Sequence, residues 1–324
     1  MSLGRRVAVI DVGSNSIRLV VADVAPDGRI AVVEERRETP RLGAGLHDTG
    51  RLSDGATGRA LEALHGMATL AGQRHAERVV AVATSAVRDA VNGADFLQLV
   101  RETTGLALRV LDGTEEANLA LRSARAHFDL DAGRTVVMDV GGGSLELALS
   151  APGTRPQLHS HPLGAIRLTE RFLARGQSRR AVRRLRDAVR AALRESVDAD
   201  AWRAPVLIGS GGTFTALAAI HLRHDDERQA RAAHGAAIPR EAVEALLEEL
   251  RALSPAARRR VRGLNPQRAD IIVAGLAAAA EVAAHLDAPE LLVSAYGIRE
   301  GLLLESADVP DPGELSSPSA TPQR

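Results

Sequence analysis

Two stretches of the chain put an acidic residue and a small polar loop directly after an apolar run. They are "DVGSNS" at residues 11–16 and "DVGGGS" at residues 139–144. A glycine two residues after the Asp allows a turn with positive φ, which brings backbone N–H groups within reach of a phosphate. The Asp carboxylate suits a hard cation such as Mg²⁺. One such loop alone is better explained as a tight β-turn rich in turn-forming residues.

The second copy of the loop favours phosphate binding. Gly141, Gly142 and Gly143 are consecutive, and each glycine loses additional backbone entropy on folding, which is a high cost for a purely structural turn. The side chains of Ser14 and Asn15 add donors to the first loop. Two matched loops on facing domains would enclose a phosphate chain together with a metal ion.

A third glycine-rich stretch, "GSGGT" at residues 209–213, joins a predicted strand to a predicted helix. The first turn of a helix has free N–H groups and the positive end of the helix dipole, and both attract an anion. A helix entry that needs close packing explains these glycines equally well.

Hydrolysis also needs a group that orients and deprotonates water, and an acidic residue close to the terminal phosphate is the usual one. Glu115 and Glu116, in "DGTEEANLAL", lie in the first turn of a predicted helix. Complementation of the helix dipole explains acidic residues at this position equally well.

The elements that position these residues repeat along the chain. The first half predicts three antiparallel strands and then alternating helices and strands, with a hairpin turn at "PDG" and Ser53 as the N-cap of the first helix. The strands are expected at 6–12, 17–24, 30–36, 78–84 and 106–111, and the helices at 53–72, 85–104 and 114–128.

The second half predicts the same order with additional helices. Strands are expected at 134–140, 145–150, 157–164, 204–210 and 290–297. Helices are expected at 164–175, 178–196, 212–221 and 298–306, with three more within 239–285. Two such mixed-sheet halves resemble the actin-like ATPase (ribonuclease H-like) α/β fold, with an active-site cleft between two duplicated domains.

Composition excludes several classes of protein. The 324 residues suit two domains, with no Cys, 2% aromatic residues and a net charge of zero. A nucleic-acid-binding or membrane-surface protein is therefore not expected, nor are disulfides or Cys-ligated metals. The longest apolar run, residues 271–280, is too short to span a bilayer, and the N-terminus has no signal-peptide core, so a cytoplasmic protein is expected. Residues 307–324 have the composition of a disordered tail.

Six motifs in register carry a family resemblance. They are "AVIDVGSNSIRLVVADV", "ATSAVRDAVNGADFL", "LDGTEEANLAL", "VVMDVGGGSLELAL", "GSGGT" and "VSAYGIREGLLLE". In this order and spacing they resemble the exopolyphosphatase and guanosine pentaphosphate phosphatase (Ppx/GppA) family, in its short two-domain form. The implied domains are residues 1–128 and 129–297, with the closing helix at 298–306 expected to pack back on the first domain.

The resemblance also implies the site residues. Glu116 corresponds to the base that activates the attacking water, and Arg88 to an arginine that contacts substrate phosphates, for which a forked guanidinium is well suited. Asp139, Glu146 and Asp11 correspond to the carboxylates around a divalent metal, Mg²⁺ or Mn²⁺. The two phosphate loops correspond to Gly13, Ser14, Asn15, Gly141, Gly142, Gly143 and Ser144, and the third loop to Gly211, Gly212 and Thr213.

The implied reaction is hydrolysis of the terminal phosphate of inorganic polyphosphate, which releases orthophosphate. Hydrolysis of guanosine pentaphosphate (pppGpp) is the alternative, and it needs a guanine pocket that the sequence does not reveal. An actin-like kinase and a non-catalytic sensor of polyphosphate or alarmone also share the fold. The motifs "TEEA" and "TSAVRDAVN" disfavour the kinase, and a carboxylate at residue 116 beside an anion disfavours the sensor.

A row of arginines bears on the substrate. Arg179, Arg183, Arg186, Arg190 and Arg194 follow helical spacing along one face of a predicted helix. Such a row would guide a polyphosphate chain, although a solvated helix face in an arginine-rich protein explains it better. Family members are often dimers, so a homodimer is compatible with the sequence, which identifies no interface.

Overall fold

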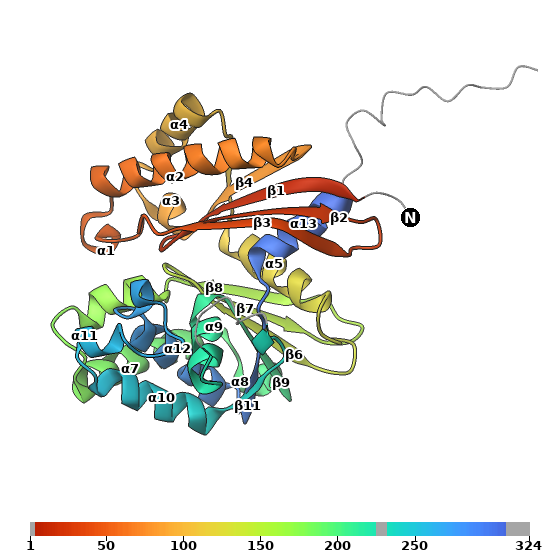
Figure 1. Cartoon of the computed structure of the whole chain (residues 1–324). Coiled ribbons are helices and arrows are strands. Elements are labelled where there is room, and N and C mark those ends of the chain that lie inside the picture. Colours follow the sequence, from red (N-terminus) through yellow and green to blue (C-terminus); the bar gives the residue numbers. More distant parts are fainter. Residues whose placement is uncertain (1–3, 225–231, 309–324) are drawn as a thin grey trace, which may run out of the picture.

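The computed structural model describes residues 4–224 and 232–308, and Figure 1 shows two lobes, each built on one sheet. The first sheet has the order β3-β2-β1-β4-β5, in which β1, β2 and β3 are antiparallel and β4 and β5 are parallel to β1. Its strands are β1 (Arg5–Val12), β2 (Ile17–Val24), β3 (Ile30–Glu38), β4 (Arg78–Ala83) and β5 (Leu108–Val110).

The second sheet repeats this arrangement. Its order is β10-β11-β9-β6-β7-β8, so that β8-β7-β6-β9-β11 matches β3-β2-β1-β4-β5 in position and direction. The strands are β6 (Thr135–Val140), β7 (Leu145–Ser150), β8 (Gln157–His161), β9 (Val206–Ser210), β10 (Ala237–Pro239) and β11 (Glu290–Val293). The predicted duplication of an actin-like ATPase fold is confirmed. Strand β10, an antiparallel edge strand, is an addition that the sequence pattern did not predict.

Helices cover the outer faces of both sheets (Figure 1). On the first sheet these are α1 (Leu46–Thr49), α2 (Asp54–Gln73), α3 (Ser85–Asp89) and α4 (Gly93–Thr104). The second half contains α6 (Ala165–Leu168), a π-helical turn (Thr169–Leu173), α7 (Arg179–Ser196), α8 (Ala199–Trp202), α9 (Gly212–His221), α10 (Arg240–Ala252), α11 (Pro255–Arg258), a 3₁₀ turn (Pro266–Arg268) and α12 (Ile272–His285). Ser53 caps α2 as predicted, because its side chain accepts a hydrogen bond from the N–H of Ala56.

Two helices lie between the sheets: α5 (Gly113–Arg125) and α13 (Ile298–Asp308). Helix α5 packs on β6, β7 and β8, and its Ala120 and Leu121 share a core with Val137. Helix α13 packs on α5, β1 and β2, and its Leu302 contacts the core around Val9. Helix α5 therefore precedes the predicted boundary at residue 128 and still packs on the second sheet. The boundary stays a prediction.

The prediction of a single helix at residues 85–104 is wrong, because a short non-helical segment separates α3 from α4. The Asn92 side chain, at the break, accepts a hydrogen bond from the N–H of Leu52 and donates one to its carbonyl oxygen. A Cβ atom on Gly93 would lie 2.1 Å from the carbonyl oxygen of Val87, so this tight reversal needs a glycine. The contact between Asn92 and Leu52 is tertiary, so helical periodicity does not report it, whereas the contact between Gly93 and Val87 is local.

The predicted arginine row lies on α7, and part of it is bound to other helices. Arg186 forms ion pairs with Glu244 of α10 at 2.7 Å and with Glu281 of α12 at 2.5 Å. Arg190 pairs with the same Glu281 at 3.0 Å, and this carboxylate is almost fully buried. These two arginines join helices of the second half.

Within the described residues, no helix has the length and apolarity needed to cross a bilayer. The predicted apolar run at 271–280 forms the start of α12, which is buried on all sides. Residues 309–324, most of the predicted disordered tail, lie outside the described residues.

Candidate active site

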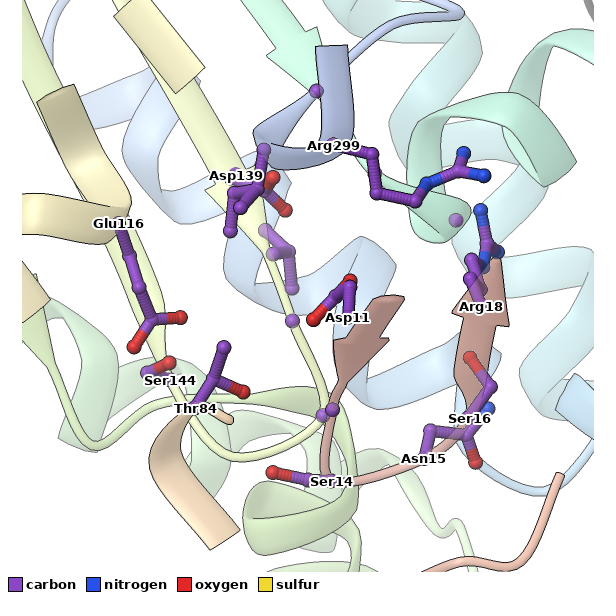
Figure 2. Close-up of a pocket in the computed structure, with 18 of the residues that line it drawn as sticks. Asp11, Ser14, Asn15, Ser16, Arg18, Thr84, Glu116, Asp139, Ser144 and Arg299 are labelled. Atoms are coloured by element: carbon purple, nitrogen blue, oxygen red, sulfur yellow. The ribbon is translucent and has the colours of Figure 1, made fainter. Parts of the chain in front are cut away.

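The glycine loops of the two sheets meet at a cavity of 130 Å³ between the lobes (Figure 2). Five carboxylate residues line it, together with both predicted phosphate loops, the third loop and the segment before α13: Asp11, Glu116, Asp139, Glu146 and Glu300. Its lining includes Asp11, Gly13, Ser14, Asn15, Glu116, Asp139, Gly141, Gly142, Gly143, Ser144, Glu146, Gly211 and Gly212. The fold thus brings residues from both halves of the chain into one site.

The first two loops have the same backbone turn. The N–H of Gly13 donates to the carbonyl oxygen of Ser16 at 3.1 Å, and that of Gly141 donates to Ser144 at 3.0 Å. Among the described residues, neither loop contains a glycine with positive φ, so the predicted reason for these glycines is wrong.

Close approach explains the glycines of the second loop instead. A Cβ atom on Gly143 would lie 1.9 Å from Oγ of Ser85 and 2.7 Å from Oγ of Ser14. A Cβ atom on Gly142 would lie 2.9 Å from Cβ of Ser14. The loops of the two sheets therefore touch directly, and a side chain at either glycine would separate them.

The third loop supports Asp139. Gly211 has a φ of +92°, and a Cβ atom there would lie 2.5 Å from Oδ1 of Asp139. Ser210 Oγ donates to Oδ2 of Asp139 at 2.9 Å. Thr213 is buried and its hydroxyl lies 3.4 Å from the carbonyl oxygen of Val140, so its side chain is turned away from the cavity, which Thr215 lines instead.

Burial raises the pKa of four of these carboxyl groups. The pKa of Asp11 is raised to about 6 and that of Glu116 to about 7. The pKa of Asp139 is raised, with the Ser210 hydrogen bond opposing the shift, and that of Glu146 is raised well above its usual value by burial and by the charge of Glu116. A cluster of buried carboxyl groups of this kind favours the binding of protons or of a cation.

These carboxylates fit a divalent metal ion. Oδ1 of Asp11 is buried and has no hydrogen-bond partner within the described part of the chain. In residues 4–224 and 232–308, no group of three or more His, Cys, Asp or Glu side chains already converges as a metal site. Mg²⁺ commonly binds through one or two carboxylates, with waters and phosphate oxygens completing its coordination. Asp11, Asp139 and Glu146 suit that mode.

The two glutamates at the start of α5 have different environments. Glu115 completes a capping box, because its Oε2 accepts a hydrogen bond from the N–H of Asp112 at 2.8 Å. Glu116 is 3% exposed, faces the cavity, and accepts a hydrogen bond from Nη1 of Arg88 at 2.5 Å. The same Nη1 donates to the carbonyl oxygen of Leu111 at 2.6 Å. Dipole complementation thus explains Glu115 and not Glu116.

The cavity is also lined by three arginines that sequence reasoning did not assign to the site: Arg18, Arg268 and Arg299. Figure 2 shows Arg18 and Arg299 on the side opposite Glu116, with Asp11 and Asp139 between them. A sequence signal existed for Arg18, because it pairs with Asp11 across β1 and β2 and so shares its face of the sheet. Arg268 comes from a turn before α12, where no motif marks it.

Comparisons with known proteins agree with this architecture. The family model of the Ppx/GppA phosphatase family matches residues 19–309. Exopolyphosphatase 2 of Mycobacterium tuberculosis is 34% identical, covering 93% of this chain and 98% of its own length. Exopolyphosphatase 1 of Mycobacterium leprae is 31% identical, covering 94% of this chain and 90% of its own.

Solved structures show the same relationship. The Ppx/GppA family member of Aquifex aeolicus is similar with a TM-score of 0.77 at 29% identity, covering 93% of this chain and 97% of its own. An exopolyphosphatase of Cytophaga hutchinsonii is similar with a TM-score of 0.84 at 25% identity, covering 94% and 98%. With the family model matching nearly the whole folded region, this chain belongs to the Ppx/GppA phosphatase family.

Proposed function

We propose that the protein is an exopolyphosphatase, which removes the terminal phosphate of inorganic polyphosphate by metal-dependent hydrolysis. The observation that carries the proposal is the single cavity that holds Glu116, a ring of metal-suited carboxylates and two facing glycine loops. The relatives named exopolyphosphatase support it, because they match this chain over nearly their whole length.

In this reaction the terminal phosphoryl group lies between the loops of Ser14 and Ser144, whose hydroxyl and N–H groups donate to its oxygens. When bound, Mg²⁺ or Mn²⁺ held by Asp139, Glu146 and Asp11 neutralises phosphate charge. Glu116 accepts a proton from the attacking water. A water oxygen–phosphorus bond forms, the phosphoanhydride bond breaks in line with it, and orthophosphate and a polyphosphate shortened by one unit are released.

The pKa of Glu116 suits this function. A general base works best when its pKa lies near the working pH, and burial raises the pKa of Glu116 to about 7. Arg88 opposes this shift by its hydrogen bond and charge, which keeps Glu116 available in its ionised form. Arg88 is also the proposed contact for substrate phosphates.

The size and charge of the cavity favour an inorganic end group. Sites for drug-sized ligands occupy about 300–1,000 Å³, whereas this cavity measures 130 Å³. A cavity of this size suits a phosphoryl group and a metal ion better than a nucleoside. Arg18, Arg268 and Arg299 provide positive charge for the phosphates that follow.

A second cavity favours guanosine pentaphosphate as an alternative substrate. It measures 610 Å³ and shares Tyr296 and Glu300 with the catalytic cavity. Tyr296 stacks on His127 at 3.7 Å between ring centroids, in a chain with few aromatic residues. Stacking of a guanine base on this pair would provide the guanine pocket that pppGpp hydrolysis needs.

The test is phosphate release from polyphosphate, pppGpp and ATP, each with Mg²⁺ or Mn²⁺, by the wild type and by Glu116→Gln. We expect polyphosphate to be the best substrate and the substitution to lower turnover about 100-fold or more, because it removes the base. Glu115→Gln is the matched control, since its side chain caps α5 outside the cavity, and it should retain most of the turnover. Undiminished turnover in Glu116→Gln would contradict the mechanism. A cytoplasmic location and a homodimer stay predictions.

A further inference from the structure

A chain of alternating charges connects Glu116 to the second glycine loop. Nη1 of Arg88 lies 2.5 Å from Oε1 of Glu116, and Nε of Arg88 lies 3.6 Å from Oδ1 of Asp89. Oδ2 of Asp89 accepts a hydrogen bond from Nη2 of Arg167. Nε of Arg167 donates to the carbonyl oxygen of Gly143 at 3.1 Å. Each side chain thus touches the next, from the base to the loop.

This charge chain crosses from one half of the molecule to the other. Arg88 and Asp89 end α3 on the first sheet, whereas Arg167 lies in α6, which directly follows the second sheet's hairpin. The hydrogen bond between Arg167 and Asp89 therefore links the two lobes directly. The side chains of these two residues are 34% and 23% exposed, so water screens them only in part.

We infer that Asp89 and Arg167 are positioning residues: when the cleft is closed, they hold Arg88 against Glu116 and tie that pair to the loop that receives the phosphate. The inference rests on the proposed function, because it assigns Glu116 the base and Gly143 a phosphate contact. It adds a link between closure of the lobes and alignment of the reacting groups.

The geometry explains why Arg88 needs this support. Arginine has many rotamers, and Nη1 of Arg88 alone serves both Glu116 and the carbonyl oxygen of Leu111. Asp89 restrains the guanidinium from its Nε side. Asp89 without Arg167 would attract Arg88 more strongly and draw it away from Glu116, so Arg167 balances the charge. Its planar fork reaches Asp89 and Gly143 together, which the single ammonium of lysine cannot do.

Other contacts hold the lobes together without touching Arg88 or Glu116. Arg41 forms a two-pronged ion pair with Asp270, with both distances 2.7 Å. The N–H of Gly45 donates to Oε1 of Glu170 at 2.8 Å. Closure therefore has its own contacts. The Asp270 pair supplies a matched control, because it links the same lobes through the same chemistry.

The test compares kcat and KM for phosphate release from polyphosphate of defined length at saturating Mg²⁺. Asp89→Asn and Arg167→Gln should each lower kcat about tenfold, since small misplacements of reacting groups cost rates of this order. We expect KM to change by less than about threefold, because ground-state binding is kept. The loss of kcat in the double variant should be no larger than that in the less active single variant, because both residues act through Arg88.

Arg167→Lys tests charge against geometry. It keeps a cation beside Asp89 but gives up the contact with the carbonyl oxygen of Gly143, so it should recover only part of the kcat lost in Arg167→Gln. Asp270→Asn should lower the melting temperature and leave kcat at the wild-type value. Circular dichroism of each variant checks that it is folded.

Three results would overturn the inference, and the first two are an unchanged kcat in both single variants and additive losses in the double variant. A rise in KM alone would do the same, because it would indicate a contact that serves closure only. Failure of the proposed function looks different, since the wild type would then release no phosphate or Glu116→Gln would retain its turnover. The inference would fall with it.

Discussion

At Glu116 two opposing influences act on one carboxyl group. Burial raises its pKa to about 7, and the hydrogen bond and charge of Arg88 pull it down. Only the ionised form accepts a proton from water, so kcat/KM should fall as the pH drops through the pKa of the free enzyme. A bound divalent cation lowers that pKa, so with Mg²⁺ the midpoint is expected at or below about 7.

Replacing Arg88 should move this acidic limb to higher pH. Arg88→Gln removes the cation that stabilises the ionised form of Glu116, so its pKa rises and the base is lost at a higher pH than in the wild type. The measurement is the pH profile of kcat/KM for both proteins at saturating Mg²⁺. A limb that stays in place or moves to lower pH contradicts the assignment of Glu116 as the base.

Gly143 is the residue at which the two loops approach most closely. We expect Gly143→Ala to lower turnover strongly and to lower the melting temperature, because the new methyl group would overlap Oγ of Ser85. Gly66→Ala is the matched control, since it lies on the exposed face of α2 with open space around it. That change should raise the free energy of unfolding by about 0.5–1 kcal/mol. Equal stability effects in the two variants would contradict the close approach.

At the scale of elements, the first turn of α5 holds Glu116, the proposed base, in place. Asp112 caps this helix by accepting hydrogen bonds from the N–H groups of Thr114 and Glu115, each at 2.8 Å. Asp112→Ala should lower the free energy of unfolding by about 1 kcal/mol, the usual cost of a lost N-cap. It should also lower kcat, because Glu116 lies in the turn that frays. Chemical unfolding and steady-state kinetics measure the two effects, and a stability loss with unchanged kcat would separate the cap from catalysis.

Helix α7 is the element whose arginines suggested a path for polyphosphate. Arg186 and Arg190 instead bind Glu281, which is 2% exposed. Glu281→Gln should destabilise the protein by less than the about 3–5 kcal/mol that breaking an isolated buried ion pair costs, because Arg186 keeps Glu244 and Arg190 keeps Asp187 as partners. It should leave KM for polyphosphate unchanged. A lower KM on freeing these arginines would instead show that α7 attracts substrate.

At the scale of the whole molecule, four acidic groups from both halves share one cleft. Their pKa values are raised in the folded protein, so the native state binds more protons than the unfolded chain between about pH 4 and pH 7. Their contribution to stability is present at low pH and is lost as the pH rises through these folded pKa values. We expect a divalent cation bound among these carboxylates to supply the positive charge that the protons supply at lower pH.

We therefore expect metal removal to act on stability as well as on activity. With a chelator, phosphate release should stop and the melting temperature should fall as the pH rises from about 5 to about 7. Saturating Mg²⁺ should reduce that fall. Thermal unfolding across this pH range, with and without the metal, makes the comparison. Identical curves would show that no cation binds among these carboxylates.

Much of the local structure was predictable because it depends on neighbouring residues in the chain. Apolar alternation and turn residues located the hairpins of both sheets, and Ser53 marked the start of α2. The repeated "DVG" loops indicated a duplicated fold with an anion site, and the acidic first turn of α5 indicated a base. These signals are short-range, so one sequence is enough to read them.

Packing between distant segments decided the rest. The residue pattern left Glu115 and Glu116 equivalent and only the family resemblance indicated Glu116, whereas the arrangement of the lobes gives the physical difference: Glu116 faces the cavity and Glu115 caps α5. Contacts across the chain also break the helix after Asp89 and bring Arg268 beside the glycine loops. The same closure sets Asp89 against Arg167 and the four carboxylates against one another. Burial and charge proximity arise only when both sheets assemble, and they are what turns two loops and a glutamate into a reactive site.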